Sequence, residues 1–324
     1  FNMFLPSDHP DFPWIGMVFA PPIIGVWYWC TDQYIVQRVL SAKNVSEARK
    51  GTIFAGYLKL LPIFMFFIPG LIAYAMTKTG QLSYGSSDQV FPTLVRELLP
   101  SGIRGLVAGG LLAALMSSLS SVFNSCSTLF TMDIYKKLYP ETNEKKLVFV
   151  GRIATGIVVL SGILWIPFIK VVSGAGLYTY LQSVQAYIAP PIASVFLLGL
   201  FWSRINASGA LAALVGGFIA GMIRLGLEIK KSTLPVDGIW YQIADLNFLY
   251  FAIFSFLTCV VVLIAVSMLT PPPNLEKING LTYDTSKKNI AEADHPKSDK
   301  INSYIILAIL ALILIYFSPI GIGG

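Results

Sequence analysis

The sequence has few charged residues, few histidines and few cysteines, and each shortage argues against a class of protein. Only 12% of its 324 residues are charged, about half the share of a soluble domain. Its three cysteines, Cys30, Cys126 and Cys259, all lie in apolar stretches, so this odd number predicts no disulfide framework. Its two histidines, His9 and His295, lie in polar loops. The apolar stretches therefore lack a His, a carboxylate pair or a Cys/His set, which argues against an intramembrane hydrolase or lipid transferase.

Long hydrophobic runs dominate the rest of the chain. Hydrophobic residues make up 55% of it, and the mean hydropathy is +0.68. A helix crosses a bilayer with about 20 mostly apolar residues, and eight stretches meet that length. We therefore predict an all-α membrane protein with about eight transmembrane helices, multi-pass in the cell membrane (the inner membrane of a bacterium), with the lipid bilayer as its partner. The predicted spans are Pro13–Tyr34, Gly51–Met76, Gly105–Tyr135, Leu147–Ile169, Leu177–Trp202, Ser208–Ile229, Leu249–Leu269 and Ile301–Ser318.

The positive charges concentrate in alternate loops, so the net charge of +6 marks topology and does not indicate a nucleic-acid partner. By the positive-inside rule the loops rich in Lys and Arg face the cytoplasm, and the first span runs from outside to inside. The cytoplasmic loops are those around Arg38–Lys50, Lys136–Arg152, Arg204 and Lys277–Lys300. The external segment Lys78–Ser101 contains a short amphipathic stretch, Val90–Leu99, which is expected to fold as a small helical lid.

Two spans contain proline pairs, which predict hinges or cavity walls, or else simple kinks in structural helices. Pro21-Pro22 precede Trp27-Tyr28-Trp29, and Pro190-Pro191 follow Gln182 and Gln185. The aromatic run lies too deep for an interfacial belt. Aromatic rings that stack on a pyranose, with amides that bond its hydroxyls, are typical of a neutral sugar site.

Small and hydroxyl side chains line one face of the third span. Helical spacing places Ala114, Ser117, Ser118, Ser121 and Ser125 on that face. Neutral hydroxyls and helix carbonyls suit a hard cation such as Na⁺. The same residues also line tight contacts between membrane helices, so the pattern alone leaves both interpretations open.

Isolated charges lie inside or beside the spans. Lys59 lies within an apolar run, where a charge indicates a functional role by default. Arg224 and Glu228 are four residues apart and are expected to pair structurally. Asp32 and Asp133 are expected to act as capping or ion-pair residues.

Several of these motifs, in this order, resemble the sodium:solute symporter family, and most closely its sodium/glucose cotransporter branch. The resemblance covers most of residues 13–270. Its stretches are Trp27–Gln33 with Ile35–Arg38 and Leu40–Asn44, Gly56–Leu60, Leu115–Ser118 with Phe123–Ser125, Thr128–Tyr135, and Gly199-Leu200 with Arg204, Gly209-Ala210, Ala213 and Gly216-Gly217.

The resemblance implies the second part of an inverted five-helix-repeat (LeuT-type) fold with the first repeat missing, so an N-terminal remainder of the same transporter would be a partner. The implied division is an external loop (1–12), transporter core helices of the second repeat and a following helix (13–229), an external loop and a further transmembrane helix (230–270), a cytoplasmic linker (271–300) and a final transmembrane helix (301–324).

Site roles follow from the resemblance residue by residue. Ala114, Ser117 and Ser118 would form the visible part of the main sodium site, and Ser120 and Ser121 part of a second one. This context favours sodium binding over packing for the serines. Tyr28 would stack under the solute as an inner gate with Trp29 beside it, and Lys59 and Gln182 would contact the solute. Na⁺ is the one cofactor implied.

Three departures leave the solute open. Gln185 stands where glucose and galactose carriers usually have Thr or Ser, Thr179 where some have Asp, and Gly25 where one branch has an amide contact. The expected function is sodium-coupled symport of a sugar of the glucose or galactose kind by alternating access. Uptake of another polyol such as inositol, or a sodium-gated channel or sensor on the same fold, remains the alternative.

Overall fold

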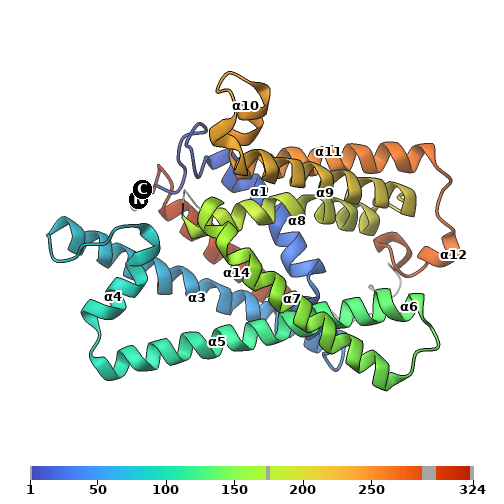
Figure 1. Ribbon diagram of the computed structural model, residues 1–324, viewed down its shortest axis with the longest axis horizontal. Coiled ribbons are helices and arrows are strands. Elements are labelled where there is room, and N and C mark those ends of the chain that lie inside the picture. Colours follow the sequence, from blue (N-terminus) through green and yellow to red (C-terminus); the bar gives the residue numbers. More distant parts are fainter. Residues whose placement is uncertain (1, 173–175, 287–296, 322–324) are drawn as a thin grey trace. The chain divides into compact units, whose positions relative to one another are not determined.

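The computed structural model of the protein describes residues 2–172, 176–286 and 297–321, and helices dominate it (Figure 1). Within those residues no strand forms, and the one β-bridge joins Leu5 to Pro13. The predicted all-α class is therefore confirmed. The helices are α1 (Trp14–Val26), η1 (Trp27–Thr31), α2 (Gln33–Leu40), α3 (Val45–Lys78), η2 (Ser87–Gln89), α4 (Val90–Leu98), α5 (Ser101–Thr128), η3 (Leu129–Tyr135), α6 (Lys136–Leu138), α7 (Glu144–Val172), α8 (Leu177–Phe201), α9 (Ala207–Ile229), η4 (Lys231–Thr233), α10 (Ile239–Asp245), α11 (Phe248–Leu269), α12 (Leu275–Ile278) and α14 (Lys297–Tyr316).

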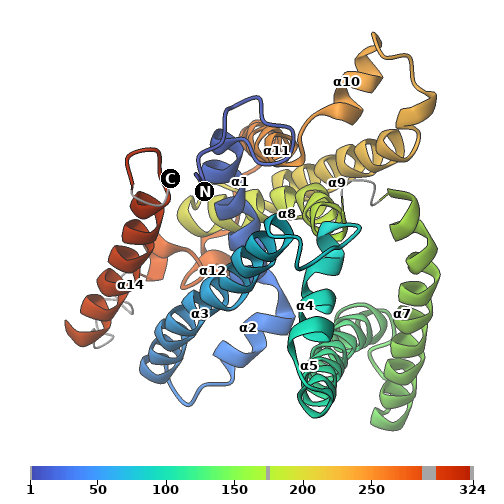
Figure 2. The same cartoon turned by 90° about the vertical axis from the view of Figure 1, so that its left-hand side faces the viewer.

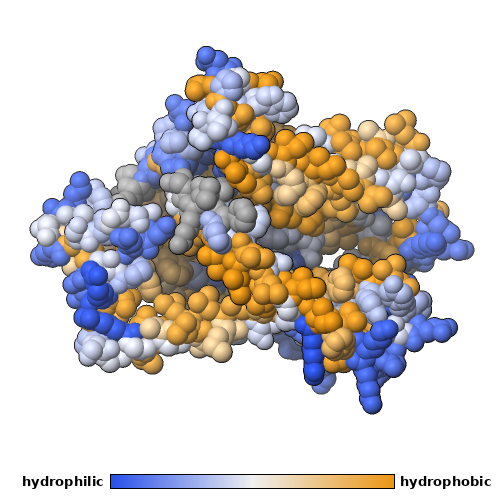
Figure 3. Space-filling model, viewed as in Figure 1, coloured by the Kyte–Doolittle hydropathy of each residue, from blue (hydrophilic) through white to orange (hydrophobic). Residues whose placement is uncertain are grey.

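Eight of the described helical segments are long and apolar enough to cross a membrane, as predicted. Some of them are longer than the hydropathy pattern indicated: the second begins at Val45, ahead of the charged Glu47, Arg49 and Lys50. A helix continues into water as long as its backbone bonds are made, whereas hydropathy marks only its apolar part. Apolar side chains cover the visible sides of α9 and α11, and hydrophilic ones gather at loops such as the turn between α6 and α7 (Figure 3).

The chain forms two compact units, which we describe separately: residues 1–57 with 178–324, and residues 58–177. In the first unit, α9 packs along α11 through small residues. A Cβ at Gly209 would lie 2.8 Å from the Leu263 carbonyl, and one at Gly217 would lie 2.7 Å from Cys259 Sγ. Glycine at these positions lets the two backbones approach closely.

In the same unit, hydrogen bonds of Asn206 connect the beginning of α9 to the residues that follow α11. Asn206 caps α9 by accepting a hydrogen bond from Gly209 N at 2.9 Å. Its side-chain amide also donates to Thr270 Oγ1 at 2.6 Å and to the Pro271 carbonyl at 2.8 Å. At the other end of α9, the chain continues past Ile229 through the turn η4 to the short helix α10 (Figure 2).

In the second unit, α5 and η3 pack on α7, where Ser127 Oγ donates to the Gly151 carbonyl at 2.8 Å. The predicted amphipathic helix is present as α4. Its Leu94 is buried together with Leu82 and with Ala73 of α3.

The proline pairs do not break their helices. α1 is helical through Pro21 and Pro22, and α8 is helical through Pro190 and Pro191. Both pairs therefore lie inside continuous helices. A proline removes one backbone donor, and in α8 the ring of Pro191 lies close to Gly217 of α9, where a Cβ would meet Pro191 Cγ. In the first span the break comes later, in the π-helical turn η1 and at Asp32, whose backbone is extended.

Candidate functional site

The aromatic run Trp27-Tyr28-Trp29 lies in η1, where the helix widens before it ends. Tyr28 meets Trp29 edge to face, with ring centroids 5.2 Å apart, and Trp27 at 6.3 Å. Tyr28 is half-buried, whereas Trp29 is 45% exposed. Asp32 caps the next helix, since its carboxylate accepts from Tyr34 N at 3.0 Å. The turn therefore presents an aromatic pair beside a break in the helix, and π-helical turns of this kind are frequent at functional sites.

Gln182 and Gln185 lie one helical turn apart on α8, and both are half-buried. They belong to the same compact unit as Tyr28 and Trp29. Their amides offer both donors and acceptors, which suits a solute with several hydroxyls.

The hydroxyl face of α5 lies in the second unit, as does Lys59 on α3. Ala114, Ser117, Ser118 and Ser120 are exposed, and Ser121 Oγ donates to the Ser117 carbonyl at 3.1 Å. Because α5 is an unbroken helix over Ser101–Thr128, these residues keep the helical spacing that the sequence predicted. The structure thus groups the five α5 residues with Lys59 in one unit, and the two aromatics with the two glutamines in the other.

Two buried hydroxyl side chains lie near the end of α5, Ser125 in α5 itself and Thr131 in η3. Ser125 and Thr131 are only 5% and 6% exposed, and the structure gives their hydroxyl oxygens no hydrogen-bond partner. Ser125 belongs to the predicted hydroxyl face, but its burial was not foreseen. Within the described residues no three His, Cys, Asp or Glu side chains gather as metal ligands.

The predicted pair of Arg224 and Glu228 is present, with Arg224 Nη1 3.9 Å from Glu228 Oε2. A third residue, which the sequence pattern did not indicate, joins the pair: the Tyr187 hydroxyl donates to the Glu228 carboxylate. Tyr187 is on α8 and 41 residues from Glu228, so no short-range spacing could have found it.

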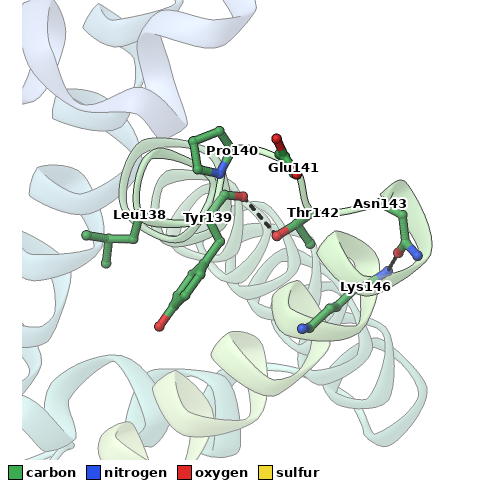
Figure 4. Close-up of a pocket in the computed structure, with 7 residues that line it drawn as sticks. All are labelled: Leu138, Tyr139, Pro140, Glu141, Thr142, Asn143 and Lys146. Atoms are coloured by element: carbon green, nitrogen blue, oxygen red, sulfur yellow. Dashed lines mark hydrogen bonds between the residues drawn. The ribbon is translucent and has the colours of Figure 1, made fainter.

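A cavity of about 460 Å³ lies at the turn between α6 and α7 and contains none of the predicted site residues (Figure 4). Thr142 Oγ1 donates to the Tyr139 carbonyl at 2.8 Å, and Asn143 caps α7 by accepting from Lys146 N at 2.9 Å. These local bonds are those of an ordered loop. The lining residues are Leu138, Tyr139, Pro140, Glu141, Thr142, Asn143 and Lys146.

Comparison with known proteins places these features in one family. Residues 1–217 match the model of the sodium:solute symporter family. The chain is 39% identical over 310 residues to the sodium/myo-inositol cotransporter 2 of Mus musculus. This alignment covers 91% of the chain and 46% of that protein. It is 41% identical over 288 residues to the sodium/glucose cotransporter 1 of Ovis aries, covering 84% of the chain and 43% of that protein.

A third relative, the sodium/glucose cotransporter 4 of Danio rerio, is 38% identical over 314 residues, 91% of the chain and 48% of that protein. The chain thus spans about half the length of the curated relatives it matches. The family and these relatives are membrane transporters, not enzymes. On the extent of the family match and the identity to these proteins, the chain is a multi-pass membrane protein that belongs to the sodium:solute symporter family.

Proposed function

We propose that this chain works in sodium-coupled symport of a sugar or polyol by alternating access. The observation that carries the proposal is the unbroken α5 helix, which keeps Ala114, Ser117 and Ser118 at helical spacing in a chain of this family. Na⁺ needs several oxygen ligands, and this face supplies hydroxyls without a fixed negative charge. Ser120 and Ser121 would contribute to a second sodium ion.

The solute would bind over Tyr28 with Trp29 beside it, and Gln182, Gln185 and Lys59 would bond its hydroxyls. The edge-to-face pair of Tyr28 and Trp29 supports this role, because it leaves the Tyr28 ring half-buried at a break in the helix. Sodium and solute are coupled if each binds one conformational state better than the other. We propose that sodium favours the outward-open state and that rocking of one helix bundle releases both ligands inside.

The coverage of the relatives supports a further part of the proposal, that these helices act together with an N-terminal remainder of the same transporter. Among solutes, relatives with inositol and with glucose in their names resemble the chain about equally. Gln185 favours a solute with hydroxyls around the whole ring, such as myo-inositol, as a second candidate beside glucose.

The test is uptake of radiolabelled glucose and myo-inositol by cells that express the full-length protein, in a sodium gradient and with choline in place of sodium. We expect sodium to drive accumulation of one solute above its outside concentration. Sodium-dependent flux that only equilibrates the solute would indicate a sodium-gated channel instead, and absence of sodium dependence would refute the proposal.

A further inference from the structure

A buried charged cluster joins α8 to α9 in the unit of residues 1–57 and 178–324. The Tyr187 hydroxyl donates to Glu228, and Glu228 lies 3.9 Å from the Arg224 guanidinium. Arg224 is 3% exposed, and its Nη2 donates to the Leu246 carbonyl at 2.8 Å. One carboxylate therefore connects a tyrosine of α8 to an arginine of α9, and the arginine reaches the chain just before α11.

Aromatic rings enclose the arginine. Its guanidinium carbon lies 5.9 Å from the Tyr187 ring centroid and 5.8 Å from that of Phe251. The two rings meet edge to face at 5.5 Å. Gly221 lets α9 approach α8 at this point, because a Cβ there would lie 2.6 Å from the Tyr187 carbonyl. The Tyr187–Glu228 hydrogen bond connects α8 to α9, whereas Arg224 Nε and Nη1 have no hydrogen-bond partner among the described residues. The bond to Glu228 therefore favours one arrangement of the two helices over others.

The cluster lies on the opposite side of α8 from the two glutamines. At about 100° per residue, the direction of Tyr187 around the α8 axis differs from that of Gln185 by about 160° and from that of Gln182 by about 140°. Tyr187 is 1% exposed, whereas both glutamines are half-buried. A bond that fixes Tyr187 against α9 therefore fixes the rotation of α8 about its axis, and with it the direction of both amides.

We propose that Tyr187 and Glu228 are positioning residues for solute recognition, which rests on the proposed function of Gln182 and Gln185. They do not contact the solute. Their hydrogen bond sets the angle at which the two amides meet the hydroxyls of the ring. A small rotation of α8 would lengthen those amide bonds and reduce the preference for a solute over an analogue that lacks one hydroxyl.

The test compares Tyr187→Phe with the full-length wild-type protein in sodium-driven uptake. Phenylalanine keeps the ring beside Arg224 and Phe251 and removes only the hydroxyl. We expect the solute concentration for half-maximal uptake to rise about tenfold to a hundredfold, the range for one lost hydrogen bond to a charged group. The preference for glucose or myo-inositol over its monodeoxy analogue should fall with it. Glu228→Gln retains an acceptor oxygen, so this preference should stay near the wild-type value.

Ser194→Ala is the matched control, since Ser194 is a fully buried hydroxyl of α8 that donates to the Pro191 carbonyl at 2.8 Å, farther from the glutamines. It should leave the preference unchanged. A double-mutant cycle gives the decisive result: in a Gln182→Ala, Gln185→Ala background, Tyr187→Phe should have no further effect on solute affinity.

An additive effect in that cycle would overturn the proposal. So would an unchanged preference in Tyr187→Phe, or loss of that variant from the membrane, which would make the cluster a folding element. If the wild-type protein shows no sodium-driven uptake, the proposed function fails and the inference with it. If the wild type transports but Tyr187→Phe keeps the full preference, only the positioning role fails.

Discussion

Gly217 of α9 lies against Cys259 of α11, so closely that a Cβ at residue 217 would come 2.7 Å from the cysteine sulfur. It would also meet the Pro191 ring of α8. Its neighbour Gly216 has no such contact within 4 Å. Two adjacent glycines of one motif therefore have different requirements, and only one of them is needed for close packing.

Gly217→Ala should destabilise the protein by about 1 to 3 kcal/mol, the usual cost of overpacking a tight contact. Gly216→Ala is the matched control and should be neutral or slightly stabilising, because alanine is the better helix former. Thermal unfolding of the two variants in detergent measures the difference. Equal midpoints would show that α9 and α11 do not pack through Gly217.

The ion pair of Arg49 and Asp299 connects the beginnings of α3 and α14. The charged atoms lie 3.9 Å apart, with Arg49 23% and Asp299 8% exposed. Arg49→Gln should cost about 1 to 2 kcal/mol, between the values for exposed and for buried pairs. Lys50→Gln removes the exposed pair with Glu47 at 3.0 Å and should have no measurable effect. Unfolding midpoints check both, and an equal loss in the two variants would contradict the prediction.

The serines of α5 are predicted to bind sodium. Ser117→Ala and Ser118→Ala should each raise the sodium concentration for half-maximal uptake about threefold to tenfold, as expected for loss of one hydroxyl ligand. Ser161→Ala is the control, because Ser161 is an exposed α7 serine whose hydroxyl donates to the Ile157 carbonyl at 2.8 Å. Unchanged sodium dependence in both α5 variants would assign those serines to packing.

Tyr28 is predicted to stack on the solute. Tyr28→Ala should abolish uptake while the protein still reaches the membrane, and Tyr28→Phe should retain much of it, since the ring and its contact with Trp29 remain. Uptake and surface labelling are measured together. If both variants fail to reach the membrane, the ring serves folding and not transport.

Gln185 is predicted to read one hydroxyl of the solute. Gln185→Thr should change the ranking of glucose, galactose and myo-inositol in competition for uptake, whereas Gln182→Ala should weaken all three. An unchanged ranking in Gln185→Thr would place the side chain outside the solute site.

The sequence predicted the helices because each needs only a long apolar run, and it predicted α4 and the Arg224–Glu228 pair because both depend on spacing within one helix. It left open whether the prolines break or only bend their helices, and it could not show that Pro191 lies close to Gly217, because that is a tertiary contact. The bond from Tyr187 to Glu228 was missed for the same reason. Composition reports which residues prefer lipid, but not which partner each polar group finds.

The π-helical turn has one more consequence. The Trp27 carbonyl accepts two hydrogen bonds, from Thr31 Oγ1 at 2.6 Å and from Asp32 N at 3.2 Å. In an ordinary helical turn a carbonyl that loses its single amide donor inside a membrane is left unsatisfied, at considerable cost. Here the threonine hydroxyl would still satisfy the carbonyl if the backbone bond opened. If that backbone bond opened, the Asp32 amide would lose its partner while the Trp27 carbonyl kept one, so a change of path at this end of η1 would leave one backbone group unpaired and not two.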